Sequence, residues 1–200
     1  MYRQFFKRTI DIIFSIIIIC LLLPFIIFIY LLLKFTYKKS FYLHERVGIN
    51  GKIFNCIKFK TMHEGADELL KTLIINDKNI KEEWNKTYKI SKDPRVTKIG
   101  KILRKYKLDE IPQFINIIKG EMSIVGPRPL TEDEFSKFFT KNEKIKYLSI
   151  NPGLTGEWQV NSKKISNYKM RIECELGYVE SYNFFKDIKL MIFTLFAIFQ

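Results

Sequence analysis

The longest hydrophobic pattern in the chain lies near its N-terminus. Residues 10–33 are apolar apart from Asp11 and Ser15. A straight helix of this length would reach roughly 36 Å, which is enough to cross a bilayer core of about 30 Å. No small-residue cleavage site follows the run, so a removable signal peptide is not expected. The pattern predicts a membrane-embedded segment over residues 1–39 and a second, membrane-associated domain over residues 40–200.

Two features bear on how this segment enters the membrane. Pro24 interrupts the run, removes one helix hydrogen bond and is expected to bend the helix. The arms on either side would be only about 21 and 14 Å long, each too short to span. Basic residues flank the run at both ends, which favours both ends lying on the cytoplasmic side. These flanking residues are Arg3, Lys7 and Arg8 before the run and Lys34, Lys38 and Lys39 after it.

Together these features predict a re-entrant hairpin bent at Pro24. A single crossing with a proline kink accounts for the same pattern, because neighbouring helices tolerate such kinks. The residues alone leave both alternatives open.

The remaining pattern predicts one α+β domain, mostly helical, with a small antiparallel sheet. Residues 41–60 are typical of two strands around a turn at residues 48–51. Apolar residues recur at helical spacing over residues 64–88, with a break near 76–78, and again over residues 99–106 and 111–118, the last ending before Gly120. A further helix is expected after Thr131. Thr131 and Glu134 would form its capping box, and Leu130 and Phe135 its hydrophobic staple.

The C-terminal part of the chain is expected to contain a strand and an apolar helix. A loop at residues 151–156 precedes a predicted strand at residues 158–160. Residues 188–199 are nearly all apolar but too few to span a bilayer. They are expected to form either a core helix or an amphipathic helix lying in the membrane interface.

The charge of the chain indicates an acidic partner. The formal net charge is +13, which suits anionic lipid headgroups, phosphate-bearing substrates or nucleic acid. No nucleic-acid-binding motif and no basic stripe interleaved with aromatics occurs, so nucleic acid is not expected. Three cysteines and two histidines share no ligand spacing. This excludes a recognisable zinc site or disulfide framework and is typical of a reducing, cytoplasmic environment.

The strongest candidate for chemistry is the adjacent acid pair Asp109 and Glu110, at the predicted start of a helix. Adjacent helical side chains point about 100° apart, so one carboxylate could face a phosphorus atom while the other holds a metal ion or a proton. Aspartate is an established nucleophile toward phosphorus. Mg²⁺ is commonly bound by one or two carboxylates together with substrate phosphates. Taken alone, the pair is also explained as a helix N-cap.

Basic residues near this pair are candidates for binding substrate phosphates. Arg128 is presented by the stiff Gly-Pro-Arg-Pro turn at residues 126–129, which suits a bidentate phosphate contact. Lys58 and Lys60 would form a second cationic edge, although the same alternation describes a strand with a solvated face. Arg104 precedes the acid pair by five residues.

These motifs resemble the bacterial sugar transferases, which are small monotopic phosphoglycosyl transferases. The resemblance is carried by residues 107–113 and by the turn at residues 126–129, and it extends over nearly the whole chain. Residues 91–100 and 152–160 are similar to the branch that transfers galactose phosphate and glucose phosphate. The resemblance implies a re-entrant membrane helix bent at a proline and a location at the cytoplasmic face of the bacterial inner membrane.

The resemblance also implies a reaction. Asp109 would attack a UDP-sugar, release UMP and form a phosphosugar-aspartate intermediate, which a polyprenyl phosphate such as undecaprenyl phosphate would then attack. Glu110 would assist as a Mg²⁺ ligand or as a proton acceptor. Arg104 and Arg171 match family positions and are expected to bind substrate phosphates, whereas Arg46 matches a family arginine to which no role is assigned here. Such a reaction would initiate surface-glycan assembly.

Other functions remain as alternatives. A membrane-anchored scaffold or binding protein would use the acid pair only as a helix cap. A two-carboxylate hydrolase is disfavoured, because glycosidase carboxylates flank a bond from positions at least about 5 Å apart. A homo-oligomer is compatible with the sequence.

Overall fold

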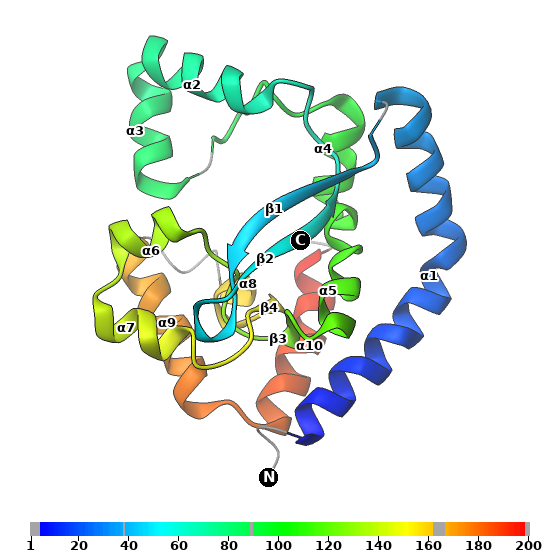
Figure 1. Cartoon of the computed structure of the whole chain (residues 1–200), viewed down its shortest axis with the longest axis vertical. Coiled ribbons are helices and arrows are strands. Elements are labelled where there is room, and N and C mark those ends of the chain that lie inside the picture. Colours follow the sequence, from blue (N-terminus) through cyan, green and yellow to red (C-terminus); the bar gives the residue numbers. More distant parts are fainter. Residues whose placement is uncertain (1–4, 38, 89, 162–166, 199–200) are drawn as a thin grey trace.

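The chain folds into a mostly helical α+β structure, shown in Figure 1. This computed structural model describes residues 5–37, 39–88, 90–161 and 167–198, so the flanking residues Arg3 and Lys38 lie outside the described part. The helices are α1 (Lys7–Tyr37), α2 (Ala66–Asn76), α3 (Lys78–Thr87), α4 (Lys98–Lys105), α5 (Gln113–Lys119), α6 (Glu132–Phe138), α7 (Lys141–Tyr147), α8 (Glu157–Asn161), α9 (Tyr168–Ser181) and α10 (Phe184–Ile198), with 3-10 turns η2 (Ile49–Gly51) and η3 (Leu108–Glu110). The strands are β1 (Phe41–Val47), β2 (Ile53–Phe59), β3 (Ser123–Val125) and β4 (Gly153–Thr155).

The apolar N-terminal segment forms a single helix, α1, which curves along one edge of the domain (Figure 1). Pro24 lies inside this helix without a loop, so the two arms of the expected hairpin are parts of one bent helix. By length and composition α1 could cross a membrane. Its C-terminal half nevertheless contacts the domain, because Leu33 is buried in one cluster with Phe59 and Leu103.

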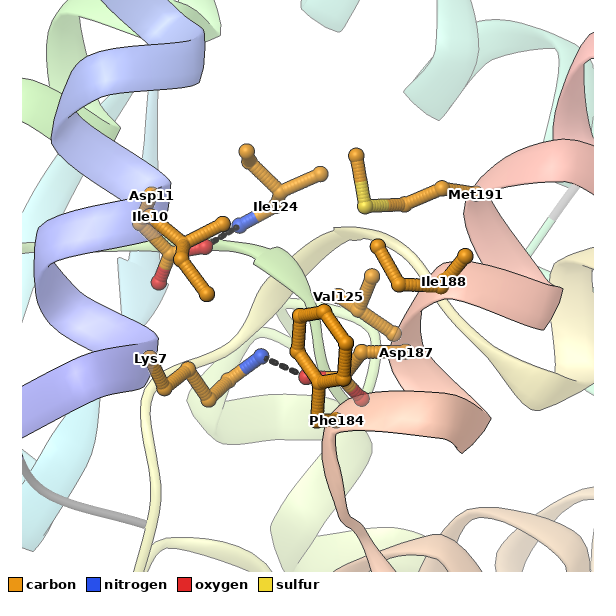
Figure 2. Close-up of a pocket in the computed structure, with 9 residues that line it drawn as sticks. All are labelled: Lys7, Ile10, Asp11, Ile124, Val125, Phe184, Asp187, Ile188 and Met191. Atoms are coloured by element: carbon orange, nitrogen blue, oxygen red, sulfur yellow. Dashed lines mark hydrogen bonds and ion pairs between the residues drawn. The ribbon is translucent and has the colours of Figure 1, made fainter. Parts of the chain in front are cut away.

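The N-terminal end of α1 is held to the domain by polar groups (Figure 2). Asp11 accepts hydrogen bonds from Ser123 Oγ at 2.8 Å and from Ile124 N at 3.1 Å, both on β3. Lys7 Nζ lies 2.5 Å from Asp187 Oδ2 on α10. A buried carboxylate is costly unless it is hydrogen-bonded, so these contacts explain how Asp11 is accommodated in an apolar run. Since both ends of α1 contact the same domain, the helix lies against it instead of projecting from it.

The predicted strand pair at residues 41–60 is confirmed. β1 and β2 are antiparallel, with Phe41 opposite Phe59 and Val47 opposite Ile53. The turn between them contains Asn50 at φ 55° and Gly51 at φ 79°, both in the left-handed region. Side chains alternate along a strand, and this register places His44 opposite Cys56. His44 and Arg46 therefore share a face of the sheet with Cys56 and Lys58.

The prediction of a strand at residues 158–160 is wrong. These residues belong to α8, and the strand is β4, which falls inside the predicted loop and pairs in parallel with β3. The two backbones approach so closely that a Cβ on Gly153 would lie 2.1 Å from Gly126 N. Glycine is therefore required at this contact. The pairing joins segments far apart in the sequence, which a local pattern cannot reveal.

The other helix predictions are confirmed. The break between α2 and α3 falls at Asp77, whose side chain caps α3, and α5 ends at Gly120 in the left-handed conformation. The Thr131 and Glu134 side chains form the expected capping box of α6. The apolar tail forms α10, in which Leu190 is buried whereas other large apolar residues are exposed. These exposed residues are Phe184, Phe185, Ile188, Ile192, Phe193, Leu195 and Phe196.

Candidate active site

The acid pair lies in η3, a short turn between α4 and α5. The residue before η3 is Lys107, at φ 54°, and the residue before α5 is Pro112. Neither helix has a side-chain cap hydrogen bond at these positions. The prediction that Asp109 or Glu110 is an N-cap is therefore wrong, because neither carboxylate occupies a cap position, although both lie in the first turn of η3.

Glu110 is ion-paired within the domain. Lys58 Nζ on β2 donates a hydrogen bond of 2.9 Å to Glu110 Oε1, and the Glu110 side chain is 25% exposed. Burial alone would raise the pKa of Glu110, but the positive charges of Lys58 and Arg128 outweigh it and lower the pKa to about 2. Glu110 is consequently ionised at neutral pH.

Asp109 experiences the opposite effect. Burial, reinforced by the negative charge of Glu110, raises the pKa of Asp109, while Lys58 and Arg104 oppose this. Two neighbouring carboxyl groups whose pKa values move apart are typical of sites in which the two perform different tasks. Asp109 is the more basic of the pair, which suits a nucleophile.

A pocket opens beside Glu110. Its polar lining residues are Arg46, Lys58, Glu110, Gln113, Arg128 and Gln159. Three cationic side chains thus converge on a space that contains one carboxylate. Arginine and lysine arranged in this way favour a ligand that carries phosphate groups.

Arg104 lies near Asp109, and neither Arg104 nor Lys60 lines this pocket. Arg104 Nε donates to Thr61 Oγ1 at 2.9 Å, and its charge lowers the pKa of Asp109. Lys60 Nζ is paired with Glu64 Oε1 at 2.6 Å. The structure therefore brings Lys58 and Arg128 together with Glu110, places Arg104 on the side of Asp109, and pairs Lys60 with a different carboxylate.

Arg171 occupies a different environment from the one expected. Its side chain is buried, with 6% of the residue exposed, and its Nε lies 3.7 Å from Glu175 Oε1. The guanidinium packs over the rings of Trp158 and Tyr168, at 4.2 and 4.8 Å from their centroids. Arg171 does not line the pocket. This side chain is enclosed by α8 and α9, and its direct contact with a substrate phosphate stays a prediction.

Sequence analysis assigned no role to Arg46 and considered His44 only as a possible metal ligand, which the spacing excluded. Arg46 Nη1 donates to His44 Nε2 at 2.8 Å, which requires that this ring nitrogen carry no proton. Burial and the adjacent Arg46 charge lower the pKa of His44 to about 4, so the ring is neutral at pH 7. The sequence shows that His44 and Arg46 alternate along one predicted strand. Only the register of β1 with β2 shows that both share a face with Lys58.

The acid pair fits Mg²⁺ only if substrate phosphates complete the coordination. Within the described ranges, no group of three or more His, Cys, Asp or Glu side chains is placed to hold a metal ion. Asp109 and Glu110 would supply one or two oxygen ligands, since Lys58 already engages one oxygen of Glu110. Mg²⁺ is often bound in this way, through few carboxylates together with phosphates and water.

Comparisons with known proteins show which family the chain is similar to. The family described as bacterial sugar transferase matches residues 2–200. The chain is 40% identical over 193 residues to the exopolysaccharide production protein ExoY of Rhizobium meliloti, covering 96% of this chain and 84% of that protein. It is 38% identical over 191 residues to the undecaprenyl-phosphate galactose phosphotransferase of Salmonella typhimurium, covering 96% of this chain and 40% of that protein.

An uncharacterized sugar transferase of Haemophilus influenzae is also similar, at 40% identity over 190 residues. That alignment covers 94% of this chain and 40% of the relative, so the chain spans well under half the length of this relative and of the Salmonella protein. The family match extends over almost every residue, including the acid pair and the Arg128 turn. The chain therefore belongs to the bacterial sugar transferase family.

Proposed function

We propose that this protein is a phosphoglycosyl transferase that moves a sugar-1-phosphate from a UDP-sugar to a polyprenyl phosphate and releases UMP. The observation that carries the proposal is the acid pair, in which the pKa of Asp109 is raised and that of Glu110 is lowered; Glu110 lines a cationic pocket, and Asp109 is its neighbour in the chain but does not line it. Family membership and the name of the Salmonella relative, an undecaprenyl-phosphate galactose phosphotransferase, support the same reaction class. The reaction would initiate the assembly of a surface glycan.

The proposed reaction has two displacement steps. A carboxylate oxygen of Asp109 attacks the sugar-side phosphorus of the UDP-sugar, the bond to the bridging oxygen breaks, and UMP leaves with the electron pair. An oxygen of the polyprenyl phosphate then attacks the same phosphorus, which frees the Asp109 carboxylate and forms a polyprenyl diphosphate sugar. Phosphoryl transfer depends mainly on alignment and charge neutralisation. Lys58, Arg46 and Arg128 provide positive charge at the pocket, and Arg104 provides it near Asp109.

Glu110 is assigned an electrostatic role in this scheme. A carboxyl group with a pKa of about 2 is a poor proton acceptor at neutral pH, so Glu110 suits a metal ligand better than a general base. Asp109 and Glu110 would hold Mg²⁺, which when bound would neutralise charge on the substrate phosphates. Chelation with EDTA is accordingly expected to stop turnover, and added Mg²⁺ to restore it.

The proposed location is the cytoplasmic face of the bacterial inner membrane, with α1 entering and leaving on one side. Contacts at both ends of α1 with the same domain support this arrangement, as do the basic residues at each end. The exposed apolar side chains of α10 would lie in the membrane interface, where amphipathic helices bury one face among lipids.

The deciding experiment measures UMP release by the purified full-length protein with polyprenyl phosphate, Mg²⁺ and a panel of UDP-sugars. Asp109→Asn is expected to abolish UMP release and covalent labelling by a sugar-labelled donor. Asp133→Asn, at an exposed position in the first turn of α6, serves as the matched control and should leave both unchanged. Near-normal turnover in Asp109→Asn would contradict the mechanism. Release of UDP would indicate a glycosyl transfer, and a scaffold protein would yield no product.

A further inference from the structure

The backbone of Arg128 is held on both sides by buried side chains. The Arg128 amide donates a hydrogen bond of 3.1 Å to Glu175 Oε2 on α9. The Tyr147 hydroxyl on α7 lies 2.8 Å from the Arg128 carbonyl oxygen and also contacts Glu175 Oε2, so its single proton is shared between these two acceptors. Glu175 and Tyr147 are each only 2% exposed. Both backbone groups of the pocket arginine are therefore fixed by groups that water does not reach.

Two further residues connect this arrangement to the Arg128 side chain. Arg171 forms the ion pair with Glu175, and its guanidinium packs over the Trp158 ring at 4.2 Å from the centroid as well as over Tyr168. The Arg128 guanidinium lies over the same Trp158 ring at 5.4 Å. The group formed by Tyr147, Trp158, Arg171 and Glu175, here called the Arg128 support, thus reaches Arg128 at its amide, its carbonyl and its guanidinium.

Stability alone does not account for such a cluster. Burying an ion pair removes both charges from water, and replacing such a pair by apolar residues of similar volume is often neutral or stabilising. The hydrogen bonds that Glu175 Oε2 accepts from the Arg128 amide and from Tyr147 do, however, fix geometry, while Glu175 Oε1 and Arg171 Nη2 have no hydrogen-bond partner among the described residues. Arg128 lies between Pro127 and Pro129 in its turn and lines the pocket. A small displacement of its guanidinium would change the distance between the guanidinium and a bound phosphate.

We propose that Tyr147, Arg171 and Glu175 are positioning residues that orient the Arg128 guanidinium toward a substrate phosphate, with Trp158 as the surface against which it lies. The inference rests on the proposed function of the pocket. It gives Arg171 a role through Glu175 and Trp158 in place of a phosphate contact. It also explains why the buried ion pair of Arg171 and Glu175 is retained in contact with the turn that carries Arg128.

The test compares two tyrosines whose local structures match. Tyr147 and Tyr178 are 2% and 1% exposed, and each hydroxyl shares its single proton between one backbone carbonyl and one carboxylate. Only Tyr147 bonds to Arg128, since Tyr178 bonds to Val125 and Asp187. Tyr147→Phe and Tyr178→Phe therefore remove equivalent hydroxyls, and any difference between them reports on Arg128.

Each substitution is made in the full-length protein with Arg128 and with Arg128→Lys, and kcat/KM is measured from UMP release. Tyr147→Phe is expected to lower kcat/KM about 10-fold with Arg128 present, because a slightly misplaced group loses much of its effect on rate. In the Arg128→Lys background the same change should cost less than about 2-fold, since the residue being positioned is already altered. Tyr178→Phe should have the same small effect in both backgrounds.

Amide hydrogen exchange in a peptide covering residues 126–130 provides a readout that does not require activity. Pro127 and Pro129 have no amide proton, so few amides contribute. Exchange should be faster in Tyr147→Phe and in Glu175→Gln than in Tyr178→Phe. Unchanged exchange in both variants would overturn the inference, as would equal effects of Tyr147→Phe on kcat/KM in the two backgrounds. A wild-type protein that releases no UMP would refute the proposed function, while the exchange rates would still decide whether the support holds Arg128.

Discussion

Replacing Lys58 by methionine tests the electrostatic separation of the two active-site carboxyl groups. Lys58 is the largest favourable influence on the pKa of Glu110, which falls from 4.5 to about 2. At about 1.36 kcal/mol per pH unit, this difference corresponds to a net stabilisation of the carboxylate of about 3 kcal/mol, which remains after the cost of burial is subtracted from the favourable interactions with Lys58, Arg128 and Lys107. Glu110 is 25% exposed, so solvent screens part of this interaction. We expect Lys58→Met to lower the free energy of unfolding at pH 7 by about 1–2 kcal/mol.

The pH dependence of this effect follows from the direction of the pKa change. Because the folded-state pKa of Glu110 lies below its unfolded value, the stabilisation is present above about pH 4.5 and is lost as the pH falls toward 2. The difference in stability between wild type and Lys58→Met should therefore shrink over that range. Thermal unfolding in detergent at a series of pH values measures it.

The same substitution should change catalysis. Lys58 also lowers the pKa of Asp109, so its removal should raise that pKa further and move the acid limb of UMP release to higher pH. Lys60→Met is the matched control, because Lys60 pairs with Glu64, whose side chain is 68% exposed, and a surface pair of this kind contributes less than about 1 kcal/mol. An acid limb at the same pH in wild type and Lys58→Met would refute the argument, as would an equal displacement in Lys60→Met.

Three further predictions concern the fold and the membrane segment. A Cβ on Gly100 would lie 2.0 Å from the Thr61 carbonyl oxygen, so Gly100→Ala should destabilise the protein by about 2–3 kcal/mol. Gly177 lies in a helix where a Cβ would meet nothing within 4 Å outside the helix's own backbone, so Gly177→Ala should stabilise the protein by about 0.5–1 kcal/mol. Thermal unfolding that ranks the two variants the other way would contradict the packing at Gly100. Thr131→Ala removes the capping box of α6 and should cost about 1 kcal/mol by chemical denaturation, with an unchanged midpoint counting against the cap. Cysteines introduced at residues 5–9 and 40–50 should be labelled from the same side of membrane vesicles when the rest of the chain is wild type. In Pro24→Ala, which relieves the bend, the two groups should be labelled from opposite sides. Labelling from opposite sides with Pro24 present would show a single crossing.

Several features of this protein follow from the sequence alone, because the forces behind them act within a few residues. The apolar run specifies α1, and the turn formers at residues 48–51 specify the β1–β2 pair. The Thr131 capping box and the Gly120 stop are equally local. The acid pair and the Arg128 turn were recognised in the same way, since the residue types and their order point to phosphate chemistry.

Other features were decided only by the tertiary structure. Residues 158–160 lie in helix α8, and the strand of this region is β4, which pairs in parallel with β3, a segment about thirty positions earlier in the chain. Arg171 was predicted to touch phosphate, yet its burial against Trp158 and Glu175 depends on how α8 and α9 pack. Periodicity and capping are encoded by neighbouring residues, whereas a pocket formed by β1, β2, η3 and the Arg128 turn exists only once strand register and long-range packing bring these segments together.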